Sequence, residues 1–143
     1  MEIIELLFRG MSIMSLEYTE IVKNHFFHPR NVGRIKSPSG SGTVGNPSCG
    51  DVMTIDISVK NDKIVEAKFQ TYGCAAAIAS GSMTTEIIKG KNIHECYKLS
   101  MEDIIKQLGG LPKEKTHCSN LATEALHKAI KDYEKNKKEN NKE

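Results

Sequence analysis

The stretch VMTIDISVKNDKIVEAKFQTY, residues 52–72, decides the fold of this chain. In its first half every second side chain is apolar, and this apolar set is Met53, Ile55, Ile57 and Val59. After the polar turn at residues 61–63 the alternation returns, with Val65, Ala67, Phe69 and Thr71 on one side. Successive side chains of a strand point to opposite faces, so both halves predict strands with one buried face and one face in water. Together they predict a β-hairpin.

Helical patterns lie on both sides of this hairpin. The predicted helical segments cover residues 18–28, 75–89, 92–97, 100–108 and 118–133. Pro29 and Gly90 provide stops, and Asn92 and Ser100 provide N-terminal caps. The Gly- and Ser-rich stretch before the hairpin leads through Thr43 and Val44 into a further edge strand. The pattern therefore predicts a small sheet accompanied by helices.

Size and composition predict a single core and exclude several classes of function. The chain has 143 residues, enough for one domain with its own core. Its 20 basic and 18 acidic residues leave a net charge of +2, which argues for no nucleic-acid or membrane partner. No apolar run is long enough to span a membrane, so the expected location is the cytoplasm. Thiols stay reduced there, and the four cysteines then call for a metal-binding or reactive role.

We expect three parts along the chain: an N-terminal extension at residues 1–17, one folded domain at residues 18–134 and a charged tail at residues 135–143. The extension is expected to be flexible. It is either an additional amphipathic segment or the result of an over-long gene prediction, with translation starting at Met14 rather than Met1. Past Tyr133 almost nothing can be buried, which predicts a frayed helix end or a disordered tail.

Three cysteines occupy special backbone positions. Cys49 lies in a Pro- and Gly-containing loop, NPSCGD at residues 46–51, which no regular element absorbs. Cys74 and Cys118 each lie near the N-terminus of a predicted helix, where the helix dipole favours the thiolate. Cys96 has no titratable or turn-forming neighbour and is interpreted as a structural thiol. The other three are candidates for one shared site.

Any such site must be assembled by the fold, because the cysteines are far apart in the sequence. Both zinc and iron–sulfur clusters take four protein ligands and prefer thiolates. Three thiolates leave one position, and Asp51 and His117 each lie within two residues of a cysteine. The sequence leaves open which of the two is the fourth ligand. A cluster held by three thiolates and one oxygen or nitrogen atom should exchange more readily than one held by four thiolates.

The motifs resemble the IscU / NifU N-terminal family of iron–sulfur cluster assembly scaffolds. The segments that carry the resemblance are NPSCGD (46–51), GC (73–74) with IAS (78–80), KTHCS (115–119) and PRNVG (29–33). The resemblance runs from about Tyr18 to Tyr133. It implies an α+β fold with a small three-stranded antiparallel sheet, helices packed on one face and the three cysteines gathered at one exposed end.

The resemblance also implies a function. A protein of this family is a scaffold or carrier rather than an enzyme: it assembles a [2Fe-2S] cluster from iron and from sulfur delivered by a cysteine desulfurase, and passes the cluster to apo iron–sulfur proteins. Cys118 matches the sulfur acceptor. The implied ligands are Cys49, Cys74 and Cys118 with Asp51 or His117, which would hold iron or zinc when no cluster is bound.

Two departures from the family pattern bear on partners and on an alternative function. Many members have Leu-Pro-Pro-Val-Lys before the His-Cys pair, a segment recognised by an Hsp70-type chaperone. Here the apolar middle is replaced by Lys113 and Glu114, which argues against that partnership because the groove would have to desolvate both charges. The alternative is a zinc-binding, SufU-like sulfur-acceptor partner of a desulfurase, but the interval from Cys74 to Cys118 has no room for the insert of that branch.

Overall fold

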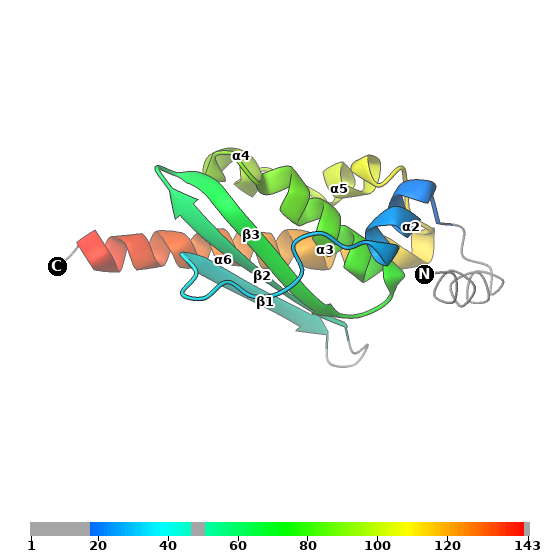
Figure 1. Cartoon of the computed structure of the whole chain (residues 1–143), viewed down its shortest axis with the longest axis horizontal. Coiled ribbons are helices and arrows are strands. Elements are labelled where there is room, and N and C mark those ends of the chain that lie inside the picture. The colour runs from blue at the N-terminus through cyan, green and yellow to red at the C-terminus, as the bar shows by residue number, and fades with distance from the viewer. Residues whose placement is uncertain (1–17, 47–50, 142–143) are drawn as a thin grey trace.

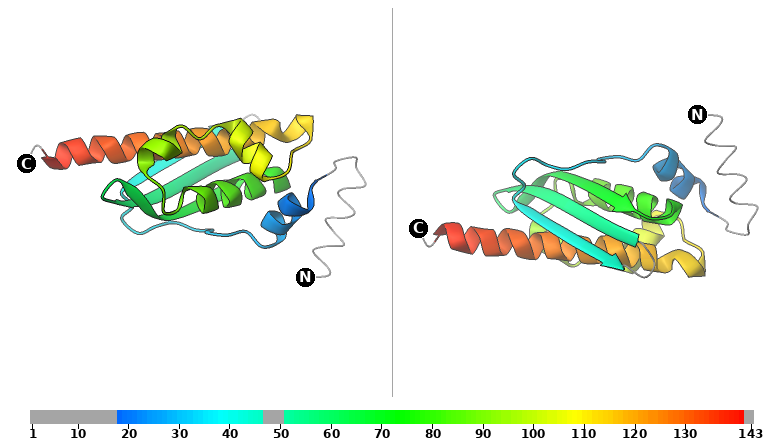
Figure 2. Two further views of the ribbon diagram at one scale, coloured as in Figure 1. Left: turned by 90° about the horizontal axis from the view of Figure 1, so that it is seen from above. Right: turned by 90° about the horizontal axis from the view of Figure 1, so that it is seen from below.

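The structure, a computed structural model, describes residues 18–46 and 51–141. Three strands form one open antiparallel sheet in the order β1-β2-β3: β1 (Gly40–Asn46), β2 (Asp51–Lys60) and β3 (Lys63–Tyr72). The helices are α2 (Glu20–Phe27), α3 (Ala75–Ile88), α4 (Ile93–Tyr97), α5 (Met101–Gln107) and α6 (Thr116–Asn141), with a 3₁₀ turn η1 at Lys113–Lys115. Figures 1 and 2 show α3 and α6 side by side on the same face of the sheet. The predicted α+β fold is confirmed. None of the described helices is long and apolar enough to cross a membrane.

The hairpin of β2 and β3 builds the core, as the alternation predicts. Three side chains of β2 on the helix-covered face, Met53, Ile55 and Ile57, are fully buried. The turn between the strands has positive φ at both Asn61 and Asp62, the geometry of a two-residue hairpin turn that follows the twist of the strands. The hairpin therefore closes where its polar turn predicts.

The prediction of which β3 side chains point into the core is wrong for the first residues of the strand. A register shift between Ser58 and Val59 reverses the alternation near the turn. Ile64 is consequently buried, whereas Val65, predicted to point inward, is 50% exposed. Because the side-chain period of a strand is two, one extra residue is enough to exchange the two faces.

Asp56 on β2 faces away from the helices and is nevertheless buried. The segment that follows α2 crosses this outer face, and there Arg34 Nε donates to Asp56 Oδ2 at 2.7 Å. The hydroxyl of Ser41 and the backbone N–H of Ile35 also donate to this carboxylate, at 2.6 and 3.0 Å. Burial alone would raise the pKa of Asp56, but these hydrogen bonds outweigh it and lower the pKa. The carboxylate thus ties the crossing segment to the sheet.

Replacing this carboxylate tests that anchor. We expect Asp56→Asn to lower the free energy of unfolding at neutral pH by about 2 to 3 kcal/mol, because Arg34, Ser41 and the N–H of Ile35 lose a charged acceptor. A carboxylate whose pKa is lowered by folding stabilises above its unfolded pKa, and this stabilisation disappears as the pH falls through the folded pKa. Urea unfolding of wild type and variant should therefore converge in acid. Glu66→Gln, an exposed acid on β3, is the control and should change stability little.

Helix α6 lies directly against β1, and two glycines permit this approach. A Cβ atom at Gly42 would lie 2.2 Å from the carbonyl oxygen of Ala125, and one at Gly40 would lie 2.2 Å from that of Ala129. No side chain can occupy that space. Any residue larger than glycine at position 40 or 42 would push α6 away from β1, the edge strand that the helix covers.

The C-terminal end is helical, since α6 continues to Asn141, and of the two expectations, a frayed helix end or a disordered tail, only the disordered tail is wrong for residues 135–141. Its extension is held by side chains that reach the sheet. The hydroxyl of Tyr133 and the amine of Lys137 each donate to Asp62 Oδ1 at 3.2 Å, and Asn136 donates to the carbonyl oxygen of Ser39 at 3.2 Å. The sequence pattern did not include these contacts because they join residues far apart in the chain.

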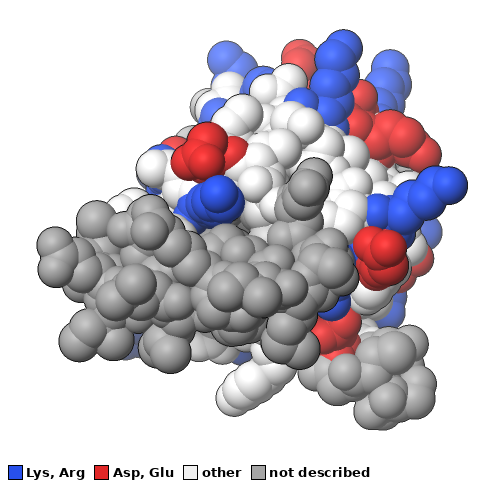
Figure 3. Space-filling model, turned by 90° about the vertical axis from the view of Figure 1, so that its right-hand side faces the viewer, with Lys and Arg blue, Asp and Glu red and all other residues white. Residues whose placement is uncertain are grey.

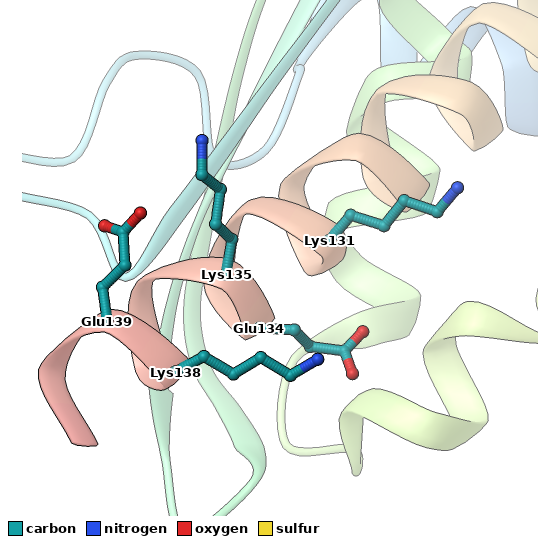
Figure 4. A pocket seen from close by; sticks show the side chains of 5 residues that line it. All are labelled: Lys131, Glu134, Lys135, Lys138 and Glu139. Atoms are coloured by element: carbon teal, nitrogen blue, oxygen red, sulfur yellow. The ribbon is translucent and has the colours of Figure 1, made fainter. Parts of the chain in front are cut away.

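The outward face of this extension carries charges of both signs. A shallow pocket of about 410 Å³ is lined by three basic and two acidic side chains of this helix, Lys131, Glu134, Lys135, Lys138 and Glu139 (Figure 4). Spacings of four residues place Glu134 before Lys138 and Lys135 before Glu139, a pattern that favours an exposed helix.

Some expectations fall outside the described residues. These are the extension at residues 1–17 with its alternative start at Met14, the loop residues 47–50 that include Cys49, and residues 142–143.

Candidate metal centre

Cys74 is positioned by the start of α3. It is the N-cap residue of that helix, with φ −78° and ψ 179°, and its carbonyl oxygen accepts from the N–H of Ala77 at 3.0 Å. Gly73 before it allows the chain to pass close to the start of β2. A Cβ atom at Gly73 would lie 3.1 Å from Asp51 Oδ1 and 2.8 Å from the Cβ of Ala77. The predicted helix start and its glycine therefore bring Gly73, the residue before Cys74, next to Asp51.

Cys118 is the third residue of α6 and is fully buried. Its Sγ lies 3.5 Å from the Sγ of Cys74. The two helices can approach this closely because the contacting residues are small: Ala76, Ala77 and Cys118 form one buried cluster. Further along the same helix contact, the hydroxyls of Ser80 on α3 and Ser119 on α6, both fully buried, lie 2.9 Å apart. The sulfur pair is thus a consequence of the packing of α3 on α6.

Asp51 and His117 complete the group. Asp51 opens β2, and its Oδ2 lies 3.4 Å from Nε2 of His117. The same imidazole nitrogen lies 3.6 Å from the Sγ of Cys118. One ligand atom from each of Asp51, His117 and Cys118 lies within 4.8 Å of the other two. Four of the five residues singled out from the sequence therefore meet at one end of the molecule, and Cys49 lies outside the described residues.

These separations agree with those between ligands of a small metal ion. Zinc binds sulfur at about 2.3 Å and nitrogen or oxygen at about 2.0 to 2.2 Å, so two ligands of a tetrahedral ion lie about 3.3 to 3.8 Å apart. The separations of 3.4, 3.5 and 3.6 Å fall within this range. Two thiols, an imidazole and a carboxylate form a donor set suited to iron or zinc. The donor atoms of Asp51, His117 and Cys118, all within 4.8 Å of one another, therefore suit such an ion, and Cys74 lies beside Cys118.

The two sulfur atoms share a proton unequally. The hydrogen bond from Cys118 lowers the pKa of Cys74 to about 5; burial opposes this effect, and the backbone N–H groups of Ala77 and Ala76 add to it. The same hydrogen bond raises the pKa of Cys118, and burial raises it further. The sequence predicted that helix dipoles would favour the thiolate at both positions. That expectation is wrong for Cys118, because two thiolates 3.5 Å apart would repel each other.

Tyr18 and Lys115 belong to this site, although neither was singled out as a site residue. Tyr18 packs against the buried cluster that contains Cys118. Burial, together with the negative charge of the two cysteines, raises its pKa to about 12. The charge of Lys115 lowers the pKa of both cysteines. The position of Lys115 three residues before Cys118 is a usable signal in the sequence. No local pattern reveals Tyr18, because it reaches the cysteines through the tertiary fold.

Cys96 lies apart from this site, in the main core. It is 2% exposed, and its Sγ lies 3.8 Å from the carbonyl oxygen of Ile88. Burial raises its pKa to about 11, so it is a weak nucleophile. The structural interpretation of this cysteine agrees with its place in the fold.

The described surface at this end of the molecule carries charges of both signs. The end of the molecule with α2 and the start of α6 faces the viewer in Figure 3, where lysine and arginine side chains are interspersed with acidic ones around uncharged surface. Long-range attraction of a strongly charged partner is not a feature of the described part of this face.

Comparison with known proteins identifies the family. The model of the family described as "NifU-like N terminal domain" matches residues 17–140. The chain belongs to this NifU-like N-terminal domain family. The iron-sulfur cluster assembly scaffold protein IscU 1 of Archaeoglobus fulgidus is 58% identical over 116 residues, which are 81% of this chain and 76% of that protein. The scaffold protein IscU of Aquifex aeolicus is 52% identical over 122 residues, 84% of this chain and 78% of its own.

Solved structures show the same NifU-like fold. The crystal structure of a nitrogen-fixing NifU-like protein (N-terminal) from Brucella abortus superposes with a TM-score of 0.67. The match covers 82% of this chain and 94% of that one at 16% sequence identity. The resemblance inferred from the four motifs is therefore confirmed at the level of the family, and the fold is shared even where the sequence has diverged.

The unequal protonation of the sulfur pair can be tested by alkylation of the metal-free protein. Because the pKa of Cys74 is lowered to about 5, its reaction with iodoacetamide should keep most of its rate at about pH 6.5, where an ordinary thiol is largely protonated. Cys118→Ala removes the S–H donor and should lower the rate of Cys74 at that pH about tenfold. The rates are read by mass spectrometry of the Cys74 peptide, with Cys96→Ser as the control. Identical pH profiles in wild type and Cys118→Ala would contradict the shared proton.

Proposed function

We propose that this protein is a scaffold that assembles a [2Fe-2S] cluster from iron and from sulfur supplied by a cysteine desulfurase, and transfers it to apo iron–sulfur proteins. The observation that carries the proposal is the meeting of Cys74 and Cys118 with Asp51 and His117, from three separate elements, at one end of a NifU-like domain. The relatives named above are scaffold proteins by name. The cluster is cargo, and the protein is a carrier rather than an enzyme. The expected location is the cytoplasm.

The proposed ligands are Cys49, Cys74 and Cys118 with Asp51 or His117. Cys49 is two residues from Asp51, and two Cα–Cα steps span at most about 7 Å. The connection from β1 to β2 begins and ends at the paired residues Asn46 and Asp51, at the same end of the sheet as the site. This short tether supports Cys49 as the third thiolate.

Cys118 is the proposed sulfur acceptor. In the transfer step its sulfur attacks the terminal sulfur of a persulfide on the donor protein. A new S–S bond forms at Cys118, the donor's S–S bond breaks, and the electron pair leaves with the donor thiolate. Cys118 has to lose its proton first, and the thiolate of Cys74, 3.5 Å away, is in position to accept it. Cys118 can thus become a thiolate nucleophile without a base supplied by the solvent.

The exchangeable ligand accounts for release. Iron bound to sulfide prefers thiolates, and a carboxylate or an imidazole is a harder, more easily replaced partner. Asp51 is only partly buried and His117 is exposed, so a competing thiolate of a recipient protein can approach them. Lys113 and Glu114 are exposed on η1, which supports direct transfer rather than delivery through an Hsp70-type chaperone.

The SufU-like alternative, a zinc-binding sulfur acceptor, uses the same residues, since Asp51, His117 and Cys118 would also suit zinc. Anaerobic reconstitution with iron, cysteine and a desulfurase separates the two functions. A [2Fe-2S] absorption spectrum, with matching counts of iron and acid-labile sulfide and transfer to an apo-ferredoxin, is the result expected of a scaffold. Zinc that iron cannot displace, with no cluster formed, would overturn the proposal in favour of the alternative.

Removing the proposed exchangeable ligand should slow release. We expect Asp51→Ala to bind a cluster that is transferred to apo-ferredoxin about fivefold more slowly, since the remaining ligands are softer and exchange less readily. Circular dichroism of the recipient's cluster follows the transfer. Glu66→Ala, which removes an exposed carboxylate elsewhere, should behave as wild type. Unchanged release from Asp51→Ala would show that the carboxylate does not govern lability.

Cys96, which is not a proposed ligand, tests the choice of the three ligand cysteines. Cys96→Ser should bind the same amount of iron and sulfide as wild type, although burial of a hydroxyl in the core should cost about 1 kcal/mol of stability. Cys74→Ser should instead lose the cluster. Iron, sulfide and unfolding by urea are measured on both variants. Loss of the cluster in Cys96→Ser, at retained fold, would mean that the wrong thiols were chosen.

A further inference from the structure

A groove opens on the face of the sheet that the helices leave uncovered. It has a volume of about 330 Å³, and its lining residues are Val32, Val52, Thr54, Gln70, Thr71 and Tyr72. Val52 pairs with Tyr72 and Thr54 with Gln70, so these four side chains share the outer face of the hairpin. None of the lining residues is charged. The groove therefore suits an apolar, uncharged occupant.

Two large apolar side chains are left in water there. Tyr72 is 80% exposed and Val32 is 53% exposed. The hydroxyl of Thr71 is already engaged, since it donates to the carbonyl oxygen of Val52 at 2.6 Å. Val52 directly follows Asp51 in the chain, and Tyr72 is two residues before Cys74. Exposed apolar surface of this kind, beside a functional site, is typical of a surface that is covered by another segment or molecule.

The chain itself contains a suitable segment. Residues 3–8 have the sequence IIELLF, and the apolar side chains that fall on one helical face are Ile3, Ile4, Leu7 and Phe8. The described chain begins at Tyr18, which packs against the Cys118 cluster at the same end of the molecule as the groove. Nine residues lie between Phe8 and Tyr18, a connection of ten Cα–Cα steps that can extend to about 33 Å. A domain of this size has a radius of gyration of only about 14 Å, so the groove lies within reach.

We propose that residues 3–8 of this chain pack their apolar side chains into the groove between Val32 and Tyr72. The proposal gives the N-terminal extension a docking site, where the sequence alone predicted flexibility. Glu5 of this segment is complemented by Lys68, whose Cδ lies 3.8 Å from the position of a Cβ atom at Gly33, next to Val32. A docked segment competes with any protein that approaches the cysteines across this face; that consequence alone rests on the proposed function.

Limited trypsin digestion tests the docking, because Arg9 places a cleavage site directly after the segment. The full chain is expressed from Met1, and its N-terminus is verified by mass. Docking should slow cleavage after Arg9, so that Tyr72→Ser and Phe8→Ser, which each remove one side of the contact, accelerate it about fivefold or more. Val65→Ser is the matched control: Val65 is also an exposed apolar residue of β3, but about 23 Å along the strand. It should leave the cleavage rate unchanged.

Nuclear Overhauser contacts provide a second measurement that does not depend on proteolysis. In the wild-type chain we expect contacts from the Phe8 ring to the methyl groups of Val52, and their loss in Tyr72→Ser. Equal cleavage rates in wild type and Tyr72→Ser would overturn the proposal, as would contacts of Phe8 with another surface such as Ile21. Contacts and protection that appear only at high protein concentration would mean that the segment docks on a second copy, which also overturns the intramolecular proposal.

Discussion

The contact between the first turn of α3 and the first turn of α6 is the constraint on which the site depends. Small side chains at Ala76 and Ala77, together with the buried hydroxyl pair of Ser80 and Ser119, let the helices meet closely. Cys74 and Cys118 are brought to 3.5 Å as a result. A larger residue at this contact would separate the helices by more than one metal ion could bridge. Helix packing therefore plays the part that a local cysteine motif plays in a zinc knuckle.

The sheet supplies a further candidate ligand, Asp51, and holds it against this helix pair. β2 begins with Asp51, and the hairpin leads directly into Gly73 and Cys74, so one antiparallel pair of strands brings Asp51 and Cys74 to the same end of the sheet. The outer face of the hairpin is anchored by Asp56 and Arg34, and the helix-covered face is filled by apolar side chains. The candidate site is consequently packed on its helix side, where Cys118 is buried, whereas His117 is exposed and Asp51 is partly buried.

This asymmetry suits assembly and release. Cys118 is buried and protonated, whereas His117 beside it is exposed, so adjacent residues of one helix offer a protected sulfur and an accessible imidazole. A buried thiol paired with a thiolate stays inert until its proton moves, which protects it from adventitious oxidation. An exposed hard ligand, in contrast, can be replaced without unfolding the domain. In the proposed site, a sulfur suited to holding a cluster and an imidazole suited to being replaced therefore lie 3.6 Å apart on adjacent residues.

The sequence by itself determined most of the local structure. Strict alternation determined the strands β2 and β3, and capping residues such as Ser100, which forms the capping box with Asp103, determined helix starts. The motifs also identified the family and the candidate ligands. In these cases the signal lies within a few residues, where backbone preferences and side-chain periodicity act.

Only the tertiary structure decided features that depend on residues far apart. The shift between Ser58 and Val59 exposes Val65, and contacts of Tyr133 and Lys137 with the hairpin turn keep α6 helical beyond the apolar pattern. The protonation of Cys118 likewise follows from its distance to Cys74, which no helix dipole in isolation predicts. Register, helix ends and proton positions are set by energies of contacts across the fold, and those contacts exist only once the chain has closed on itself.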